Sequence, residues 1–308
     1  MKKVLFVVNP HSGTKDKAGI EDIIADNIDN QQYDYSILFT TQRGDAFKFA
    51  TDATNSGTDI IVAVGGDGTV NEVASGISSI NEQRVLQGQP ISDTSLAIIP
   101  CGSGNGFARH IGMSVNPIKA VQQLNQLTQR CVDYGKINGI RFYTTCGVGF
   151  DAFVSLEFAQ AGKRGPIKYI EKTIANWVKY TPKDYILQTD DIRIDVNALL
   201  ITCGNAAQWG NNCWITPKAL LSDGWLDITI IKPFLTIEAA ALGLMLVNKS
   251  ITESSKVISF KCRHLEIIKP EEGPIHFDGD PMMSGDKIII DIVPHGLNIM
   301  IPNDIEQI

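Results

Sequence analysis

Three short loops rich in glycine and polar residues carry the strongest chemical signal in the sequence. They are Asn9-Pro10-His11-Ser12-Gly13, Gly65-Gly66-Asp67-Gly68-Thr69 and Gly102-Ser103-Gly104-Asn105. Glycine lets the backbone approach a ligand closely, and the N–H groups at the start of a following helix attract phosphate. The loops fit neither the P-loop nor the dinucleotide-binding pattern. They therefore predict a phosphate cradle of a different kind.

Asp67 is unusual in such a turn because a carboxylate repels phosphate. It becomes favourable beside a cation, or as the acceptor of a proton from an incoming hydroxyl group. Asp67 also suits a purely structural role as the cap of the next helix. The residues alone leave both interpretations open.

The sequence around these loops has the pattern of a parallel sheet whose strands are connected by crossover helices. Short β-branched runs alternate with helix-like stretches, and Gly, Pro or Asn marks each junction. The expected strands are residues 3–9, 35–40, 59–64 and 95–99, and the expected helices are residues 16–27, 45–56, 69–77 and 117–127. Because the carboxyl ends of parallel strands share one edge of a sheet, the three loops should meet there.

After residue 131 the expected strands follow one another directly, which predicts a mainly antiparallel β-sandwich with a few helices inserted. One of these strands covers residues 192–203. The chain of 308 residues is long enough for two domains. We expect them at 1–131 and 132–308, with the extreme C-terminus free to return to the first, and a site in the cleft between them. Residues 81–92 predict a mobile surface loop.

The bulk composition excludes several classes of protein. A net charge of −7 argues against nucleic acid as a partner. Six cysteines without a Cys-x-x-Cys pair fit reduced thiols in the cytoplasm. The apolar stretch 234–247 is shorter than the ~20 residues that cross a bilayer. No transmembrane helix is expected, so lipid would be met at the membrane surface.

The three loops, with Thr40-x-x-Arg43-Gly44-Asp45-Ala46 after the first, resemble the diacylglycerol kinase catalytic-domain family. That family includes bacterial lipid kinases and sphingosine and ceramide kinases, and it is related to the NAD kinases. Later stretches fall in the family order: Gly149-Phe150-Asp151-Ala152, Gly165-Pro166-x-Lys168-Tyr169, Asp223-Gly224-x-x-Asp227 and Asp278-Gly279-Asp280-Pro281. The resemblance implies an ATP-dependent kinase whose acceptor is diacylglycerol or a sphingoid or ceramide lipid.

The resemblance also implies a set of residues that contact ATP: Asn9, Thr40, Gly65, Gly66, Asp67, Gly68, Thr69, Glu72, Gly102, Ser103 and Lys168. Lys168 would lie near the phosphates, although a solvated helix lysine fits equally well. Asp151 would meet the lipid head group, or else cap the helix expected after it.

Two carboxylates compete for the catalytic role. Asp280 stands where bacterial lipid kinases carry the glutamate of an Asp-Gly-Glu motif, and its side chain is one methylene shorter. The resemblance implies Asp280 as general base and Asp67 as a nucleotide or magnesium partner, with the reverse assignment open. Asp278-Gly279-Asp280-Pro281 also suits a tight hairpin turn.

A second magnesium-related prediction concerns the loop around Asp223. It resembles a family loop in which a structural Mg²⁺ is held by the aspartate side chain and by backbone carbonyls, here those of Leu220 and Trp225. Oxygen ligands suit this hard cation. An ordinary turn fits the same residues.

The region from Lys163 to Lys183 predicts one route to the membrane. Ile167, Ile170, Ile174 and Trp177 recur at helical spacing, with Lys168, Lys172 and Lys179 among them. A basic amphipathic helix can dock on an anionic bilayer, and the same apolar stripe also suits packing on the domain core. We expect a cytoplasmic protein, transiently peripheral on the inner membrane face, with a homodimer left open.

Two other functions remain open on the sequence. An NAD kinase-like enzyme with a soluble substrate would share Gly65-Gly66-Asp67-Gly68, though not the Gly-Ser-Gly-Asn and Asp-Gly-Asp-Pro motifs together. A nucleotide- or lipid-binding regulator without kinase activity is supported by the aspartate at Asp280 in place of glutamate.

Overall fold

The computed structural model describes residues 1–13, 19–160, 180–303 and 305, and it divides into two compact units. Unit one comprises Met1–Asp133 together with Pro294–Ile308, and unit two comprises Tyr134–Val293. Two strands cross the boundary, β5 (Leu127–Ile137) and β16 (Lys287–Pro302). The end of the chain therefore belongs with unit one.

Unit one is built on a parallel sheet in the order β2-β1-β3-β4, continued by the last part of β16. Its first four strands are β1 (Lys2–Val8), β2 (Tyr33–Phe39), β3 (Ile60–Gly65) and β4 (Ser95–Pro100). All residues of β3 and β4 are buried. Such continuous apolar strands are typical of a parallel sheet covered on both faces, and the expected fold of this half is confirmed.

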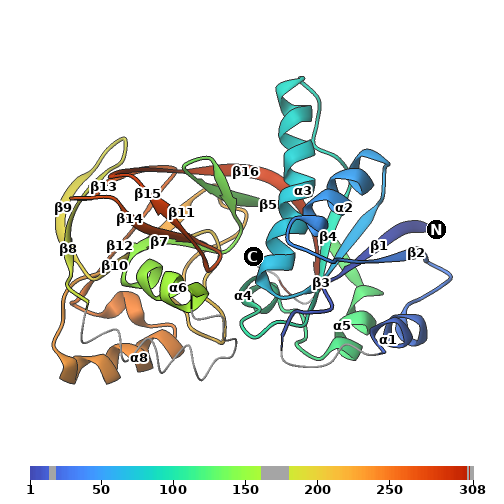
Figure 1. The fold of residues 1–308 in the computed structure, drawn as a ribbon, viewed down its shortest axis with the longest axis horizontal. Helices are drawn as coiled ribbons and strands as arrows, with labels where there is room; N and C mark the ends of the chain where they lie inside the picture. Colours follow the sequence, from blue (N-terminus) through green and yellow to red (C-terminus); the bar gives the residue numbers. More distant parts are fainter. Residues whose placement is uncertain (14–18, 161–179, 304, 306–308) are drawn as a thin grey trace. The chain divides into compact units, whose positions relative to one another are not determined.

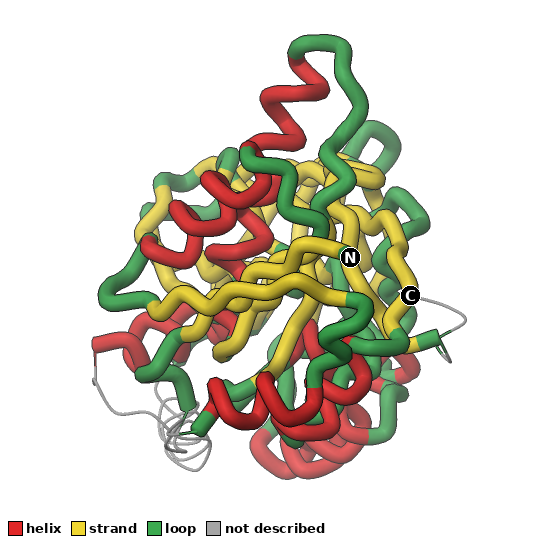
Figure 2. Tube along the Cα trace, turned by 90° about the vertical axis from the view of Figure 1, so that its right-hand side faces the viewer, coloured by secondary structure: helices red, strands yellow, loops and turns green. Residues whose placement is uncertain are grey.

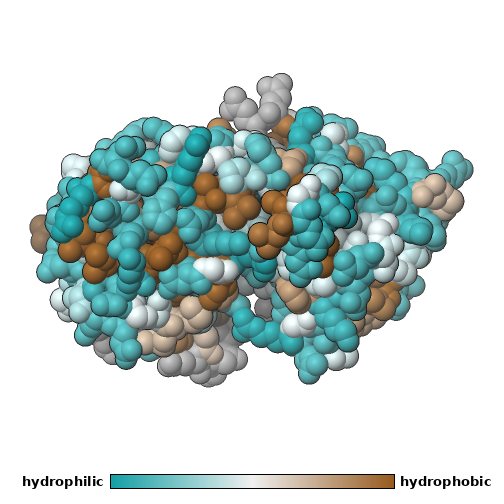
Figure 3. Space-filling view, turned by 90° about the horizontal axis from the view of Figure 1, so that it is seen from above, coloured by the Kyte–Doolittle hydropathy of each residue, from teal (hydrophilic) through white to brown (hydrophobic). Residues whose placement is uncertain are grey.

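The helices of unit one connect these strands: α1 (Ile20–Asn27), α2 (Asp45–Asn55), α3 (Asp67–Leu86), α4 (Gly106–His110) and α5 (Pro117–Leu124). The last turns of α3 and the loop after them project beyond the sheet (Figures 1 and 2). At the surface seen from above, hydrophobic residues lie among hydrophilic ones (Figure 3), as on most folded proteins.

Helix α3 is longer than its sequence predicted. The expectation of a mobile loop over residues 81–92 is wrong, because its first residues are helical and its first and last residues are hydrogen-bonded to each other. Asn81 lies within α3 and is only 1% exposed. Its Oδ1 accepts the N–H of Ser92 at 2.9 Å and the Ser92 hydroxyl at 2.8 Å, and its Nδ2 donates to the carbonyl of Gly296 at 2.9 Å. These bonds fix both ends of the connection to the sheet.

Unit two is a sandwich of two antiparallel sheets. One sheet has the order β12-β11-β10-β7-β14-β15, and the other runs from the first part of β16 through β13 and β8 to β9. Their strands are β7 (Thr145–Gly149), β8 (Lys183–Gln188), β9 (Arg193–Ala198), β10 (Leu200–Gly204), β11 (Leu226–Ile231), β12 (Val257–Cys262), β13 (His264–Ile268), β14 (Gly273–Phe277) and β15 (Asp280–Ser284). The expected antiparallel sandwich is confirmed.

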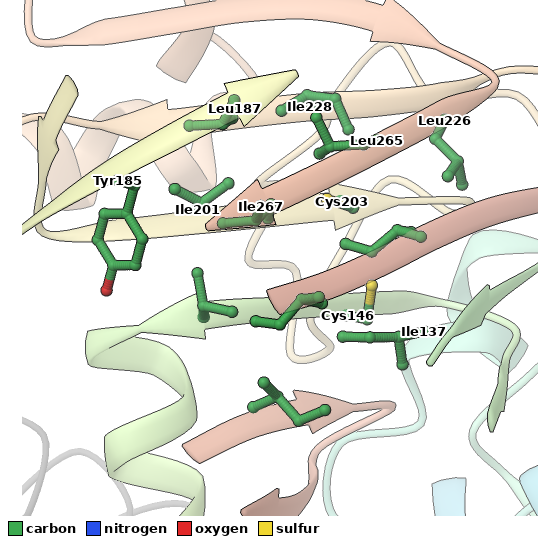
Figure 4. Packing of buried hydrophobic residues seen from close by; sticks show 14 of the residues in the cluster. Ile137, Cys146, Tyr185, Leu187, Ile201, Cys203, Leu226, Ile228, Leu265 and Ile267 are labelled. Atoms are coloured by element: carbon green, nitrogen blue, oxygen red, sulfur yellow. The ribbon is translucent and has the colours of Figure 1, made fainter. Parts of the chain in front are cut away.

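The core of unit two lies between these sheets (Figure 4). Ile201 and Ile228 of one sheet and Leu187, Leu265 and Ile267 of the other belong to the same buried cluster. The short strand β6 (Ile140–Phe142) pairs with β5. The described part of this unit also contains the helices α6 (Phe150–Gln160) and α8 (Ala239–Val247).

Candidate functional site

The three glycine loops of unit one meet at the carboxyl edge of the parallel sheet, as the sequence predicted. Asn9 follows β1, and its N–H donates to the carbonyl of Val64 in β3 at 3.0 Å. Its Nδ2 donates to the hydroxyl of Thr69 at 3.2 Å. Cys101, directly after β4, donates its N–H to the carbonyl of Gly65 at 2.7 Å. Direct hydrogen bonds therefore join the second loop to both of the others.

Close approach between the loops explains most of their glycines. A Cβ atom on Gly13 would collide with the carbonyl of Cys101, and one on Gly65 would collide with the Thr69 side chain. A Cβ on Gly102 would lie 2.5 Å from the Cα of Gly66. These glycines are required by the packing of the loops themselves, so they are not evidence for a ligand.

Gly68 is different from its neighbours because its surroundings are open. An added Cβ would meet nothing within 4 Å, and the backbone there does not need glycine for its conformation. Gly68 is the second residue of the 20-residue helix α3, whose N-cap, Gly66, has no side chain to bond the first N–H groups. The start of such a helix attracts anions through these N–H groups and the helix dipole. This open helix start is the feature of unit one that best fits a phosphate group.

The carboxylate of Asp67 is held by the third loop. Its Oδ2 accepts the N–H of Asn105 at 2.9 Å, and its Oδ1 accepts the N–H of Gly106 at 2.8 Å. Asn105 in turn bonds both the N–H and the carbonyl of Gly102 through its side chain. Asp67 therefore caps α4, a helix with which the sequence did not connect it, rather than α3, which it begins.

The remaining residues expected at the nucleotide lie around this edge. Thr40 is buried at the end of β2, where its N–H donates to the carbonyl of Val8 at 2.9 Å. Glu72 accepts the N–H of Gly44 at 3.0 Å and so ties the loop before α2 to α3. Ser103 is exposed. Lys168 lies outside the described residues, as does most of the expected amphipathic segment from 163 to 183.

Asp45, in the motif that begins with Thr40, has a low pKa. The N–H of Thr41 and then its hydroxyl, each 2.7 Å from Oδ2, lower the pKa of the Asp45 carboxyl, and the N–H of Gln42 adds to the effect. An ionised Asp45 thus orders the turn after Thr40 through accepted hydrogen bonds.

In unit two, Asp151 is part of a buried polar cluster. It lies in the first turn of α6, and its Oδ1 accepts the N–H of Ala152 at 2.8 Å. Its Oδ2 accepts the hydroxyl of Thr202 at 2.9 Å and lies 3.0 Å from Nε2 of His276. A Cβ on Gly147 would lie 2.8 Å from this oxygen, so glycine makes room for the pair. Sequence reasoning missed Thr202 of β10 and His276 of β14, because both are far from Asp151 along the chain.

Asp278 and Asp280 lie on the hairpin of β14 and β15, whose turn residues Asp278 and Gly279 have φ values of 48° and 86°. The tight turn expected as one interpretation is therefore present. The Asp278 carboxylate accepts the N–H of Tyr143 at 2.9 Å, and the N–H and hydroxyl of Thr144 at 2.8 and 2.6 Å. Asp280 is half-buried and pairs with Phe277 across the hairpin. Asp278 thus anchors the turn that positions Asp280.

The Asp223 loop carries its own cation in this structure. Oδ1 of Asp223 accepts the N–H of Trp225 at 3.0 Å, and Oδ2 lies 2.6 Å from Nζ of Lys261. The same ammonium lies 3.1 Å from Oδ2 of Asp227. Among the described residues, no group of three or more His, Cys, Asp or Glu side chains could hold a metal ion. Magnesium fits the oxygen atoms here only if Lys261 moves away, so no chemical step is assigned to a metal at this loop.

The charges of this loop change one another's pKa. Burial raises the pKa of Asp227, although the nearby Lys261 opposes the rise. Burial alone would lower the pKa of Lys261, but hydrogen bonds and the charges of Asp223 and Asp227 outweigh it and raise the pKa above the ordinary value of 10.5. The ion pair therefore favours the charged form of Lys261, whereas for Asp227 the cost of burial exceeds the attraction to Lys261.

The sequence matches two family models that together span most of the chain. Residues 3–137 match the diacylglycerol kinase catalytic domain, and residues 144–301 match the YegS C-terminal NAD kinase beta sandwich-like domain. A Stenotrophomonas maltophilia protein named "Probable lipid kinase YegS-like" is 28% identical over 275 residues, covering 86% of each chain. A Pseudomonas aeruginosa protein of the same name is 28% identical over 269 residues, covering 87% of this chain and 84% of its own.

Solved structures show the same fold. A Bacillus anthracis protein described as a "putative diacylglycerol kinase" superimposes with a TM-score of 0.77 at 25% identity, covering 99% of both chains. A second structure with this description, from the same organism, has a TM-score of 0.78 at 26% identity and covers 97% of this chain and 96% of that one. The pairing of an α/β domain with an antiparallel sandwich is thus shared along nearly the full length.

Replacing Lys261 by methionine tests the internal ion pair. At pH 7 the Asp223 and Asp227 carboxylates would lose their cation, and we expect the free energy of unfolding to fall by about 1–2 kcal/mol, less than for a fully buried pair. Urea unfolding followed by tryptophan fluorescence at several pH values measures the change. Lys287→Met, which breaks a more exposed pair with Glu266 at 2.9 Å, is the control and should have little effect.

The pH dependence of this effect has a definite sign. The raised pKa of Asp227 means that its protonation favours the folded state, so the Lys261→Met defect should shrink as the pH falls below neutral. The raised pKa of Lys261 gives the wild type stability that is present below pH 10.5 and lost as the pH rises through the folded-state value. A defect that stays constant across this pH range would contradict the assignment.

Proposed function

Since this chain belongs to the diacylglycerol kinase family, joined to a YegS-type C-terminal domain, we propose that it is an ATP-dependent lipid kinase. It would transfer the γ-phosphate of ATP to the hydroxyl of diacylglycerol or of a sphingoid or ceramide lipid. The observation that carries the proposal is the open space at Gly68 beside the start of α3, in the unit that matches the catalytic-domain model.

In this proposal, the loops of unit one bind the phosphates of ATP. The N–H groups in the first turn of α3, beside the open space at Gly68, would supply the donors. The contacts of Asn9 with Thr69 and of Asp67 with the third loop keep these donors in place before ATP arrives. Magnesium bound with ATP would offset the phosphate charge. Asp67 would hold a water bound to that ion, because a carboxylate oxygen can accept more than one hydrogen bond.

Asp280 is the proposed general base. It would accept the proton of the lipid hydroxyl as that oxygen attacks the γ-phosphorus, and the bond from phosphorus to the ADP oxygen breaks. The hairpin turn and the hydrogen bonds of Asp278 restrict the position of Asp280, whose side chain is one methylene shorter than glutamate. Asp151 would hold the lipid head group from the buried cluster with His276 and Thr202.

Gly68→Ala tests the phosphate site. A methyl group at this position has room in the protein but occupies the space assigned to ATP, so we expect the Kd for ATP to rise about tenfold or more. Folding should not suffer, because alanine is favoured over glycine in a helix by ~1 kcal/mol. Titration calorimetry with Mg-ATP measures the affinity. Gly243→Ala, also helical and open, is the matched control and should bind ATP normally.

A panel of acceptors tests the proposed reaction. The protein is incubated with γ-labelled ATP and magnesium, and with diacylglycerol, sphingosine, ceramide or NAD in separate reactions. We expect labelled product from one of the lipids. Labelled NADP instead would favour the soluble-substrate alternative, which the NAD kinase-like description of the second domain keeps open. Absence of any labelled lipid with folded protein that binds ATP would rule the lipid kinase out.

Asp280→Asn tests the general base. The amide cannot take a proton, so we expect kcat to fall by at least about 10²-fold while the Kd for ATP stays unchanged. Asp280→Glu keeps a carboxylate and should retain measurable turnover, which separates the loss of the base from damage to the hairpin. Thermal unfolding of each variant checks the fold. Near-normal turnover of Asp280→Asn would move the role to Asp67.

A further inference from the structure

The outward side of the segment from Leu235 to Val247 is apolar and exposed. This segment comprises a short 3-10 helix (Thr236–Glu238) and α8. Four large side chains on it are more than half exposed: Leu235 (69%), Ile237 (85%), Leu244 (61%) and Val247 (57%). Leu244 and Val247 lie three residues apart, on one face of α8. We call these four residues the α8 surface.

The opposite side of α8 already packs on the core of unit two. Leu242 is buried, and Leu246 and Phe234 pack against a cluster that contains Phe150 and Leu199. The apolar residues of the α8 surface therefore contribute nothing to this core. A helix on the surface of a soluble domain normally turns polar side chains to water, and exposed apolar patches of this kind mark interaction sites.

The charges around the α8 surface match an anionic lipid interface. In the sequence between Lys232 and Lys249, Glu238 is the single ionisable residue. Both of its oxygens are engaged, because Oε2 accepts the N–H of Leu235 at 2.7 Å and Oε1 lies 3.2 Å from Nζ of Lys256. Lysine thus stands at each end of an apolar strip whose one carboxylate, that of Glu238, is paired with Lys256.

Trp214 adds a third feature of an interfacial segment. Nζ of Lys249 lies 3.8 Å from the centroid of the Trp214 ring, and the N–H of Trp214 donates to the carbonyl of Leu246 at 2.9 Å. Tryptophan and lysine beside an apolar helix face are typical of segments that lie in the plane of a bilayer surface. Within the part of the chain that the structure describes, no helix is long and apolar enough to cross a membrane.

We propose that the α8 surface docks unit two on an anionic membrane. Ile237 and Leu244 enter the boundary between head groups and acyl chains, while Lys232 and Lys249 remain at the level of the lipid phosphates. This surface is distinct from the segment in which the sequence predicted a basic amphipathic helix. The inference deepens the proposed function, because it says how the enzyme reaches lipid, but binding can be measured without ATP or turnover.

Vesicle sedimentation of the full chain tests the proposal. The probes are vesicles of phosphatidylcholine alone and of phosphatidylcholine mixed with phosphatidylglycerol. We expect the wild type to bind the mixed vesicles more tightly. The double variant Ile237→Ser, Leu244→Ser should lose at least about tenfold in affinity for them without a change in melting temperature, because both side chains are exposed.

A matched control uses two exposed apolar residues of unit one. Val85 and Leu86 at the end of α3 are 57% and 87% exposed, so Val85→Ser, Leu86→Ser removes comparable apolar surface. We expect this variant to bind vesicles as the wild type does. Equal losses in the two double variants, or no binding of the folded wild type to either vesicle, would overturn the proposal.

Two further measurements separate the remaining outcomes. If sedimentation equilibrium shows a dimer that the α8 double variant converts to monomer while vesicle binding stays intact, the surface is an interface between copies and the proposal is wrong. Turnover is also compared on diacylglycerol in vesicles and in detergent micelles. The α8 variant should lose activity on vesicles alone, whereas absence of turnover on both by the wild type would contradict the kinase and not the docking.

Discussion

The two hydrogen bonds from Asn105 and Gly106 to the carboxylate of Asp67 hold the second and third loops of unit one together. Bonds of backbone N–H groups to a charged acceptor are worth roughly 1.5–3 kcal/mol each, about twice a neutral pair. The side chain of Asn105 also bonds the N–H and the carbonyl of Gly102, and Gly102 packs directly on Gly66. A carboxylate thereby becomes compatible with a phosphate-attracting turn, because its charge is directed at donors of another loop.

The same physical device recurs in unit two. The Asp278 carboxylate accepts N–H groups of Tyr143 and Thr144, which begin the approach to β7, and so attaches the β14–β15 hairpin to a neighbouring strand. In each unit the carboxylate of an aspartate that precedes a glycine accepts backbone N–H groups of another segment. The position proposed to contact ATP or the lipid hydroxyl follows one or two residues later. Gly68 follows Asp67, and Asp280 follows Asp278. Gly68 in α3 and Asp280 at the start of β15 thus each follow directly on backbone that a carboxylate holds through hydrogen bonds.

Local patterns in the sequence were enough to predict the parallel sheet and the meeting of its loops, because strand period, glycine and helix starts are properties of neighbouring residues. Contacts between distant residues were not predictable in this way. Helix α3 continues beyond its expected end, and Asn81 within it bonds the distant Gly296. Asp151 in α6 likewise contacts His276 of β14. The single strand expected over residues 192–203 divides at Leu199, so that β9 joins one sheet and β10 the other.

The apolar stretch that becomes α8 shows most clearly what composition cannot predict, namely which side of a helix faces the core. From the sequence it was too short to cross a bilayer, and nothing in its residue types separated a core side from an outer side, because leucine stands on both. Burial makes that separation: Leu242 faces the core of unit two, while Leu244, two positions later, faces outward. A helix that is apolar on both sides needs two apolar environments, and the folded unit supplies one of them. In the proposed docking an anionic lipid surface supplies the second, and the lysines at the two ends of the apolar stretch favour such a surface.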